Sequence, residues 1–359
     1  MAKKNRHALI LAGGRGTRFW PRSRKRTPKQ LLALFSDQTL IQETVGRLSP
    51  LIPVERIWVL TNDLLRRRIA RQLPQVPQEQ ILAEPAQCNT APCLGLAAQV
   101  VRQVDPDAVL GVFPADHFIA KPARFRRLVE AAYRAAEKRF LVVIGIPPKW
   151  PETGYGYIEF PEDVASGATV AVPIRRFREK PDLETAKQFL AAGCFYWNSG
   201  MFFWRADVFL EAFRRHLPKT ASLLAALPRF EDRAFPQRLK QVYPLSENIS
   251  VDYAVLEKAH NVAGLAADDI GWNDLGSWNA VYEALPKDGQ SNVARTEALG
   301  IDSRGNYVEA PGKLVALVGV NDLVVVDSPD ALLIIPRARA QQVGDVVKRL
   351  EAARREGLL

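Results

Sequence analysis

Short apolar runs alternate with amphipathic stretches over the first 150 residues of this chain. The apolar runs have the length of buried strands and lie at 8–11, 57–60, 109–113 and 141–145. Helical spacing of apolar positions lies between them, near 40–48, 63–73, 91–103 and 123–138. Alternation of this kind predicts an α/β fold in which helices cover both faces of a mostly parallel sheet.

The pattern changes twice beyond residue 150. Residues 151–205 are rich in turns and β-type residues, and a helical stretch follows over about 206–260. After about 290, Ile301-Asp302-Ser303 recurs as Val326-Asp327-Ser328, each near an apolar run. Two copies suggest the coils of a β-helix, although chance recurrence explains them as well. Residues 341–355 predict a closing amphipathic helix.

Length and composition narrow the class of protein. The chain has 359 residues, 47% of them hydrophobic, which is enough for a substantial core. We expect no transmembrane helix, because no apolar run approaches about 18 residues. The apolar stretch behind the basic N-terminus is too short for a cleaved signal peptide. Cys88, Cys93 and Cys194 are odd in number and lack zinc-site spacing, so we expect reduced thiols and a cytoplasmic location.

The charge balance is basic. Lysine and arginine total 49 against 39 acids, a net charge of +10. This excess fits a polyanionic ligand, and an ordinary basic surface explains it equally well. The basic residues do not form one block interleaved with aromatics, so we expect no nucleic-acid partner.

A glycine-rich loop follows the first predicted strand. The run Leu11-Ala12-Gly13-Gly14-Arg15-Gly16-Thr17-Arg18 precedes Thr27-Pro28-Lys29-Gln30. Its glycines allow a tight turn whose N–H groups approach phosphates, and the arginines and Lys29 add cations. The spacing matches neither a Walker loop nor a dinucleotide fingerprint. We interpret the loop as a triphosphate cradle; an ordinary strand–helix turn is the alternative.

Two acids are candidate metal ligands. Asp116 directly follows the strand at 109–113, so it falls on the same rim of a parallel sheet as the glycine loop. A carboxylate there suits Mg²⁺, although a helix cap or surface turn is the alternative; magnesium prefers oxygen, so we interpret His117 as structural. Asp274 lies in a loop with two tryptophans and two glycines, over 271–278, and could complete the magnesium site.

Three further segments fit a second substrate and a base. Lys180 follows a strand-like run and could meet a phosphate, or simply pair with Glu179. The stretches 154–157 and 197–200 suit a sugar ring or plain β-turns. The stretch 84–92 could face a purine edge, with Thr90 alternatively serving as a helix N-cap.

In this order the motifs resemble the sugar-phosphate nucleotidylyltransferases, and among them the short-form mannose-1-phosphate guanylyltransferases (GDP-mannose pyrophosphorylases). The resemblance runs from about residue 7 to about 335. It implies a Rossmann-like catalytic domain over 1–288 and a short left-handed β-helix with a closing helix over 289–359. Phe19, Arg22 and Arg178 depart from the residues common in the family, and the first two flank the phosphate loop.

The resemblance also implies a role for each candidate residue. Mg²⁺ is held by Asp116 and Asp274, and the catalytic cations are Arg18, Lys29 and Lys180. The nucleotide is bound by Leu11, Ala12, Gly13, Gly14, Gly16, Thr17, Glu84, Pro85, Asn89 and Thr90. The sugar phosphate is bound by Gly156, Glu179, Lys180, Asn198 and Asp252.

The implied reaction is GMP transfer from GTP to mannose 1-phosphate, giving GDP-mannose and pyrophosphate by in-line attack on the α-phosphate. The chain ends before the isomerase domain of longer members, so we expect transferase activity alone. We also expect a homodimer and no membrane partner. Two alternatives stay open at this point: a pyrophosphorylase for another hexose 1-phosphate or nucleotide, and a catalytically silent nucleotide-sugar sensor.

Overall fold

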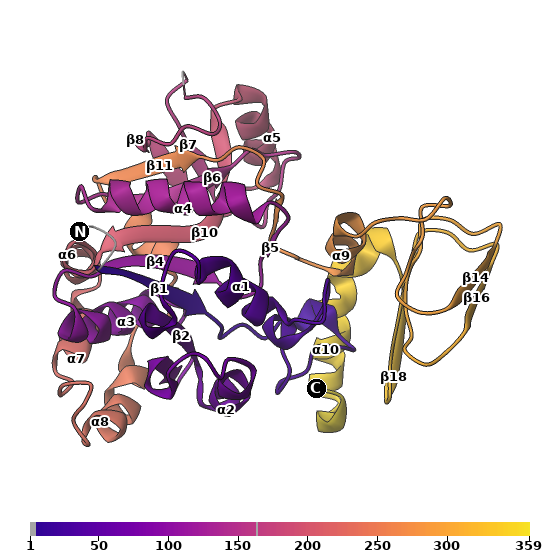
Figure 1. The fold of residues 1–359 in the computed structure, drawn as a ribbon, viewed down its shortest axis with the longest axis horizontal. Helices are drawn as coiled ribbons and strands as arrows, with labels where there is room; N and C mark the ends of the chain where they lie inside the picture. Colours follow the sequence, from indigo (N-terminus) through magenta and orange to yellow (C-terminus); the bar gives the residue numbers. More distant parts are fainter. Residues whose placement is uncertain (1–4, 163) are drawn as a thin grey trace. The chain divides into compact units, whose positions relative to one another are not determined.

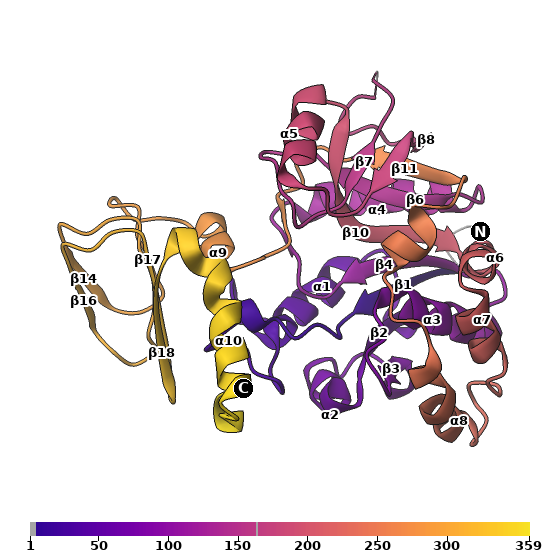
Figure 2. The same cartoon turned by 180° about the vertical axis from the view of Figure 1, so that it is seen from behind.

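The computed structural model describes residues 5–162 and 164–359, which form two compact units (Figures 1 and 2). The first, called the sheet unit here, contains 5–13, Val45–Pro114 and Ile119–Trp272. The second, the β-helix unit, contains Gly14–Thr44, Ala115–Phe118 and Asn273–Leu359. Both the glycine loop and the Asp116 segment therefore leave the sheet unit and enter the β-helix unit.

The sheet unit is built on a mostly parallel sheet with the strand order β3-β2-β1-β4-β10-β6-β11-β8. Its parallel strands are β1 (Arg6–Leu11), β2 (Ile57–Asn62), β3 (Ile81–Glu84), β4 (Val109–Pro114), β6 (Leu141–Ile146) and β11 (Val262–Ala266). Strand β10 (Phe195–Arg205) runs antiparallel between β4 and β6. The expected α/β fold is confirmed.

The strand order places a topological switch beside β1. The chain moves outward from β1 through β2 to β3, then returns to β4 on the other side of β1. At this point Leu11 of β1 pairs with Pro114 of β4, so the two carboxyl ends are adjacent. Ligands of open α/β sheets bind where such a reversal occurs. The predicted phosphate loop and Asp116 segment both begin there.

Helices cover both faces of the sheet because each presents one apolar stripe. In α4 (Pro122–Ala136) the buried positions Phe125, Leu128, Val129, Ala132 and Tyr133 recur at helical spacing. Figure 1 shows α4 along β6 and β10, where the Tyr133 ring meets Phe203 edge-on at 5.0 Å. The other face holds a large cluster with α3 (Thr90–Val104) and α6 (Ala206–His216).

The helical stretch predicted over 206–260 is interrupted by prolines. It divides into α6, α7 (Pro218–Ala225), α8 (Phe235–Val242), a 3₁₀ turn at Tyr243–Leu245 and a π-helix at Asp252–Leu256. Proline lies in the first turn of α7, α8 and the 3₁₀ turn, where its missing N–H costs no hydrogen bond. None of the helices in the described parts of the chain is long and apolar enough to cross a bilayer.

The remaining elements of the sheet unit are short. They are α1 (Leu40–Leu48), which crosses the boundary between the units, α2 (Asp63–Gln72), α5 (Leu183–Ala192), β7 (Tyr157–Glu159), β8 (Val172–Pro173) and β9 (Arg176–Arg178). Strand β7 pairs antiparallel with both β10 and β9. Strands β5 (Phe118–Ile119) and β12 (Trp272–Asn273) lie where the chain passes between units.

The β-helix unit stacks short strands in two rows. One row contains β13 (Val293–Ala294), β15 (Tyr307–Glu309), β17 (Leu323–Ser328) and β18 (Ala331–Pro336), and the other pairs β14 (Ala298–Ile301) with β16 (Val315–Val318). The 3₁₀ segment η8 (Arg337–Gln342) and helix α10 (Val343–Ala352) follow. Helix α10 confirms the closing helix that we predicted over 341–355. The core of this unit forms around Trp278 at the start of α9 (Trp278–Ala284).

The coil predicted after residue 290 is present, but the tripeptide repeat does not mark its period. Ile301 pairs with Val318, whereas Val326 pairs with Glu309. Buried Asn306 shows the true spacing, because its Oδ1 accepts from the amide of Leu323, 17 residues later. Ile301 ends its strand, and Val326 lies inside one that continues to Ser328. The two tripeptides therefore occupy different places in the coil.

Candidate active site

Lys29 joins the two candidate metal ligands within the β-helix unit. Its Nζ lies 2.6 Å from Oδ2 of Asp116 and donates to the main-chain oxygens of Asp274 at 2.8 Å and Leu275 at 3.1 Å. Lys29 is buried, with 6% of its surface exposed. Leu275 has a φ of 52°, which turns its carbonyl toward the ammonium within the tight 273–277 loop. Two segments distant in sequence thus meet at one cation.

The same contact keeps Asp116 ionised. Burial favours the neutral acid, but the Lys29 ammonium, with a smaller contribution from His117, more than offsets it and lowers the pKa of Asp116. A carboxylate that stays charged in a partly buried place can bind a cation. An ionised carboxylate meets one requirement of a metal ligand, and the metal role of Asp116 stays a prediction.

The oxygen atoms at this position fit a divalent metal ion. The Asp116 carboxylate and two carbonyls already surround one cationic group, and the Asp274 side chain belongs to the same loop. Across residues 5–162 and 164–359, no three acidic, histidine or cysteine side chains form a closed metal cage. Magnesium is usually held by one or two carboxylates together with substrate phosphates and water, so a two-acid site is sufficient.

The glycine loop packs directly on Lys29. Gly16 has a φ of 57°, and a Cβ there would lie 2.5 Å from Cβ of Lys29 and 2.8 Å from its amide nitrogen. Gln30, also buried, donates from Nε2 to the carbonyl of Gly14 at 3.0 Å. Gly14 itself has open space where a side chain would begin, as far as the described residues extend. The backbone is therefore fixed at Gly14 by the Gln30 hydrogen bond and at Gly16 by packing on Lys29, while the Cβ side of Gly14 is uncovered.

The cations of the loop contact the C-terminal segment of the same unit. Arg18 donates from Nη1 to Oε1 of Gln341 at 2.7 Å, and Arg15 forms an ion pair with Glu351. Thr17 begins a short 3₁₀ turn, Thr17–Phe19, that carries Arg18. Both arginines thus have neighbours that the sequence motif did not reveal.

Two departures from the family pattern have structural explanations. Phe19 is buried against Trp278, with ring centroids 5.1 Å apart, and its face lies 5.5 Å from Nζ of Lys29. Arg22 forms an ion pair with Glu309, which is 3% exposed within the β-helix. These residues hold the phosphate loop to the core of the β-helix unit. Arg178, on β9, is exposed.

The predicted sugar-phosphate residues meet in the sheet unit. The antiparallel pairing of β7 with β10 and β9 brings together segments before, within and after these strands. Asn198 donates its amide N–H to the carbonyl of Gly156 at 2.7 Å and its Nδ2 to Oδ1 of Asp252 at 3.0 Å. Glu179 forms an ion pair with Lys180, and a Cβ on Gly156 would lie 2.3 Å from Glu179 Oε2. All five predicted residues are neighbours.

Charge in this cluster is concentrated. Burial, together with the nearby Glu179, raises the pKa of Asp252 to about 7. Burial alone would lower the pKa of Lys180, but the paired Glu179 raises it above its usual value. Glu179 Oε2 is buried without a hydrogen-bond partner among the described residues. An acceptor left free beside a lysine is suited to a ligand that carries both hydroxyl and phosphate groups.

Aromatic rings lie next to these polar groups. Tyr155 contacts both Trp197 and Trp272 edge-on, with centroids 5.4 and 5.6 Å away, and Trp150 meets Trp197 at 4.7 Å. Flat apolar faces beside carboxylates and amides match the two kinds of surface of a hexose. The cluster therefore combines the two kinds of group that a sugar site needs, and its assignment to a sugar stays a prediction.

The predicted base segment also lies in the sheet unit. Ala12 donates its amide to Leu60 O at 2.8 Å, which continues β1 toward Gly13, and the Cβ position of Gly13 is 3.9 Å from Glu84 Oε2. The hydroxyl of buried Tyr243 donates to Glu84 Oε1. Burial raises the pKa of Glu84 to about 7, against the opposing hydrogen bonds of Tyr243 and Cys93. Pro85 follows directly.

The helix cap in this segment differs from the alternative that we considered for Thr90. The N-cap of α3 is Asn89, at φ 66°, whose Oδ1 accepts from the Thr90 amide at 2.9 Å. The Thr90 hydroxyl instead accepts from the Val251 amide at 2.9 Å. A short amide side chain tolerates this left-handed backbone, and threonine does not. Thr90 connects the segment to the turn before Asp252.

The candidate residues thus form three groups of neighbours. The phosphate and metal group, with Gly14, Gly16, Thr17, Arg18, Lys29, Asp116 and Asp274, lies in the β-helix unit. The base and sugar groups lie in the sheet unit. Sequence reasoning missed Gln30, Tyr243, Gln341 and Glu257, whose Oε1 accepts the Glu179 amide at 2.9 Å. Gln30 could have been inferred from its place beside Lys29.

A protein-family model matches the region of the chain that contains all three groups. Residues 7–291 match the nucleotidyl transferase family model. The chain belongs to the nucleotidyl transferase family. Residues 296–350 of this nucleotidyl transferase match a second model, the mannose-phosphate isomerase/GMP-like β-helix domain.

Relatives of this nucleotidyl transferase align over nearly its whole length. Mannose-1-phosphate guanylyltransferase of Escherichia coli is 39% identical over 353 residues, which are 97% of this chain and 74% of that protein. Xanthan biosynthesis protein XanB of Xanthomonas campestris pv. campestris (strain B100) is 40% identical, with 97% and 73% covered. The solved structure named mannose-1-phosphate geranyltransferase from Thermus thermophilus has a TM-score of 0.85 and 33% identity, covering 97% of this chain and 99% of that one.

Proposed function

We propose that this protein is a mannose-1-phosphate guanylyltransferase, which transfers GMP from GTP to mannose 1-phosphate and releases GDP-mannose and pyrophosphate. The observation that carries the proposal is the Lys29 bridge between Asp116 and the Asp274 loop, directly beneath the glycine turn at Gly16. The polar cluster around Glu179 and Asn198 in the sheet unit, with its neighbouring aromatic rings, supports a hexose phosphate as the acceptor. The names of the aligned relatives support the choice of GTP and mannose 1-phosphate.

The chemistry is a substitution at phosphorus. An oxygen of the mannose 1-phosphate group attacks the α-phosphorus of GTP, a P–O bond forms, and the bond to the β-phosphate oxygen breaks in line. Pyrophosphate carries away the electron pair. The attacking phosphate is anionic at neutral pH, so it needs no strong general base.

The main difficulty is repulsion between two polyanions. Two unit charges about 4 Å apart repel by about 1 kcal/mol in water and by more in a protein site. In our proposal Arg18 faces the triphosphate, Lys29 holds Asp116 and the Asp274 loop in place and adds positive charge there, and Lys180 faces the phosphate of the sugar. A divalent cation, Mg²⁺ in our proposal, held by Asp116 and Asp274 would neutralise further phosphate charge when bound. Correct positioning of the two substrates supplies the rest of the acceleration.

The decisive experiment measures pyrophosphate release across a panel of nucleoside triphosphates and hexose 1-phosphates, with and without Mg²⁺. The proposal requires GTP with mannose 1-phosphate to be the fastest pair and chelation to abolish turnover. Preference for another pair would indicate a different pyrophosphorylase. No turnover with any pair, together with tight binding of GDP-mannose, would indicate a silent sensor.

We further propose that the active form is a homodimer joined through the β-helix. Strand β14 exposes Leu299 and Ile301 at 59% and 60%, and β16 exposes Val318 at 62%. Ile301 pairs with Val318, so these side chains share one face. A second copy of the same chain would cover this apolar face. Sedimentation of wild type and Ile301→Arg tests this: the variant should be a monomer, and an unchanged dimer would rule out this face.

A further inference from the structure

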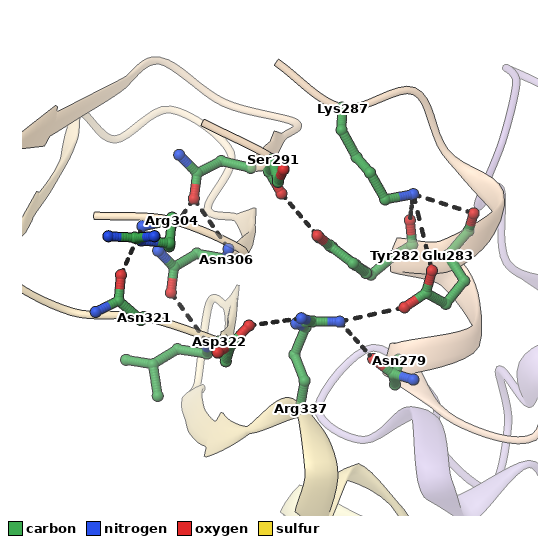
Figure 3. Close-up of polar contacts among 12 residues, drawn as sticks. Asn279, Tyr282, Glu283, Lys287, Ser291, Arg304, Asn306, Asn321, Asp322 and Arg337 are labelled. Carbon is green, nitrogen blue, oxygen red and sulfur yellow. Dashed lines mark hydrogen bonds and ion pairs between the residues drawn. The ribbon is translucent and has the colours of Figure 1, made fainter. Parts of the chain in front are cut away.

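The segment that follows the last strand of the β-helix is held in place at its first residue (Figure 3). Arg337 begins η8, and its guanidinium donates to Asp322 Oδ1 at 2.6 Å, to Asn279 Oδ1 at 3.0 Å and to Glu283 Oε1 at 3.3 Å. It also lies over the Tyr282 ring, 3.9 Å from the centroid. Asn279, Tyr282 and Glu283 belong to α9, which begins directly after the Asp274 loop.

Figure 3 also shows how the β-helix turn on the other side of Arg337 is fixed. Asn306 Oδ1 accepts from the Leu323 amide at 3.0 Å, and Asn321 Oδ1 accepts from the Arg304 amide at 2.9 Å. The Arg337 amide donates to the Asp322 carbonyl at 2.7 Å. Arg337 therefore connects η8 to helix α9, which follows the Asp274 loop, and to the β-helix turn at Asp322.

The far end of η8 contacts the phosphate loop. Gln341 Oε1 accepts from Arg18 Nη1 at 2.7 Å. Arg18 is closely bounded elsewhere too: its Nη1 is 3.6 Å from the Cβ position of Gly276, and its Cγ is 3.8 Å from that of Gly344. Both distances are those of ordinary van der Waals contacts, so a Cβ at either glycine would fit beside the arginine. The guanidinium is oriented by its hydrogen bond to Gln341 near the end of η8.

The chemistry of the contact matters. Gln341 offers a neutral acceptor, so Arg18 is oriented by one N–H while it keeps its full charge and its other donors. The neighbouring Arg15 is different, because its partner Glu351 is an acid that offsets its charge.

We propose that Gln341 is a positioning residue for the triphosphate, acting through Arg18, and that the Arg337 contacts hold the segment on which Gln341 lies. The inference rests on the proposed role of Arg18 in binding GTP. One exposed hydrogen bond is modest, so we expect a loss of about fivefold to tenfold when it is removed.

The test compares Gln341→Ala and Gln341→Glu with Gln342→Ala. Gln342 is a matched control, because its Oε1 accepts from Arg339 at 2.9 and 2.6 Å in the same kind of pair, within η8 itself. We expect Gln341→Ala to lower kcat/KM for GTP about fivefold to tenfold, with KM for mannose 1-phosphate and Tm unchanged. Gln341→Glu should lower kcat/KM for GTP further, because its carboxylate partly neutralises the charge that Arg18 presents to the triphosphate. Gln342→Ala should match wild type.

A double-mutant cycle makes the result specific. In an Arg18→Ala background, Gln341→Ala should cause no further loss, because the group that it positions is gone. Full activity of Gln341→Ala beside an impaired Arg18→Ala would overturn the positioning role and leave the proposed function intact. Additive losses in the double variant would also overturn it. A wild-type protein that neither turns over nor binds GTP in calorimetry would overturn the proposed function itself, and this inference with it.

Discussion

The ammonium group of Lys29 is buried between two loops of the β-helix unit, 2.6 Å from the carboxylate of Asp116. It also donates to two main-chain oxygens of the Asp274 loop, which fixes the place of that loop. The lysine that the sequence motif offers as a phosphate ligand is therefore also the residue that assembles the candidate metal site. A substitution of Lys29 or Asp116 therefore changes both the charge and the geometry of the candidate metal site.

Asp116→Asn should reduce kcat by orders of magnitude while the protein stays folded. The amide keeps the shape of the side chain and can still accept from Lys29, but it loses the negative charge that a divalent cation requires. Turnover should be measured over a range of Mg²⁺ concentrations, with circular dichroism to check the fold. Near-normal kcat with an unchanged Mg²⁺ dependence would remove Asp116 from the metal site.

Gly16→Ala and Gly14→Ala should separate two roles of glycine in the loop. At Gly16 the added Cβ meets Lys29 at 2.5 Å on a left-handed backbone, so we expect a loss of stability of about 1–3 kcal/mol and a large loss of activity. At Gly14 no atom of the described residues lies within 4 Å of the new Cβ, so Tm should hold. Denaturant unfolding and GTP kinetics check both variants.

The Gly14 variant carries information of its own. Unchanged stability with weaker GTP binding would indicate that phosphates approach the backbone at Gly14. Equal stability of the Gly14 and Gly16 variants would contradict the packing that we describe around Lys29.

The sheet could be predicted from the sequence because its signals are local. The apolar runs at 8–11 and 109–113 became β1 and β4, and strand–helix alternation predicted that they run parallel, but only the structure shows that they are adjacent. The glycine loop and Asp116 could be predicted to lie on one rim for the same reason. The direct contact of Lys29 with Asp116 depends on tertiary packing over many intervening residues, so no sequence spacing could reveal it.

Contacts made by the C-terminal segment had no sequence signal. Gln341 and Arg18 are 323 positions apart, and an exposed glutamine is ordinary in composition. The prediction that the repeated tripeptide marks the β-helix coils was wrong for a different reason. Its first residue ends a strand in one copy and lies inside a strand in the other. The Asn89 cap was missed because threonine is also a good N-cap, and only the left-handed backbone decides between them.

Gly156→Ala should impair the sugar site selectively. Its Cβ would lie 2.3 Å from Glu179 Oε2 and 3.2 Å from Cβ of Asn198, so the Glu179 carboxylate must move. We expect KM for mannose 1-phosphate to rise at least about tenfold, as when a polar contact to a charged group is lost, with KM for GTP unchanged. Steady-state kinetics with each substrate varied in turn measures this.

Gly154→Ala is the control for that variant. It lies two residues away, and its Cβ would meet the side chain of Glu152, at 3.1 Å for the nearest atom. A flexible side chain can move aside, so the kinetics should stay near wild type. A similar rise in KM for both variants would mean that the loop as a whole, rather than the Glu179 contact, determines sugar binding.

Asp252 should make stability depend on pH in a direction opposite to that of most acids. Its pKa is raised from 3.8 to about 7, because burial and the neighbouring Glu179 disfavour its charge. Between these values the folded protein holds a proton that the unfolded chain releases, so the free energy of unfolding falls as pH rises from about 4 to about 7 and then levels off. One full proton corresponds to about 1.4 kcal/mol per pH unit. Asp252→Asn cannot ionise and should flatten this slope, which urea unfolding at pH 5, 6, 7 and 8 would measure against wild type. Parallel curves for the two proteins would show that the buried carboxyl is already charged at pH 5, in conflict with its position beside Glu179.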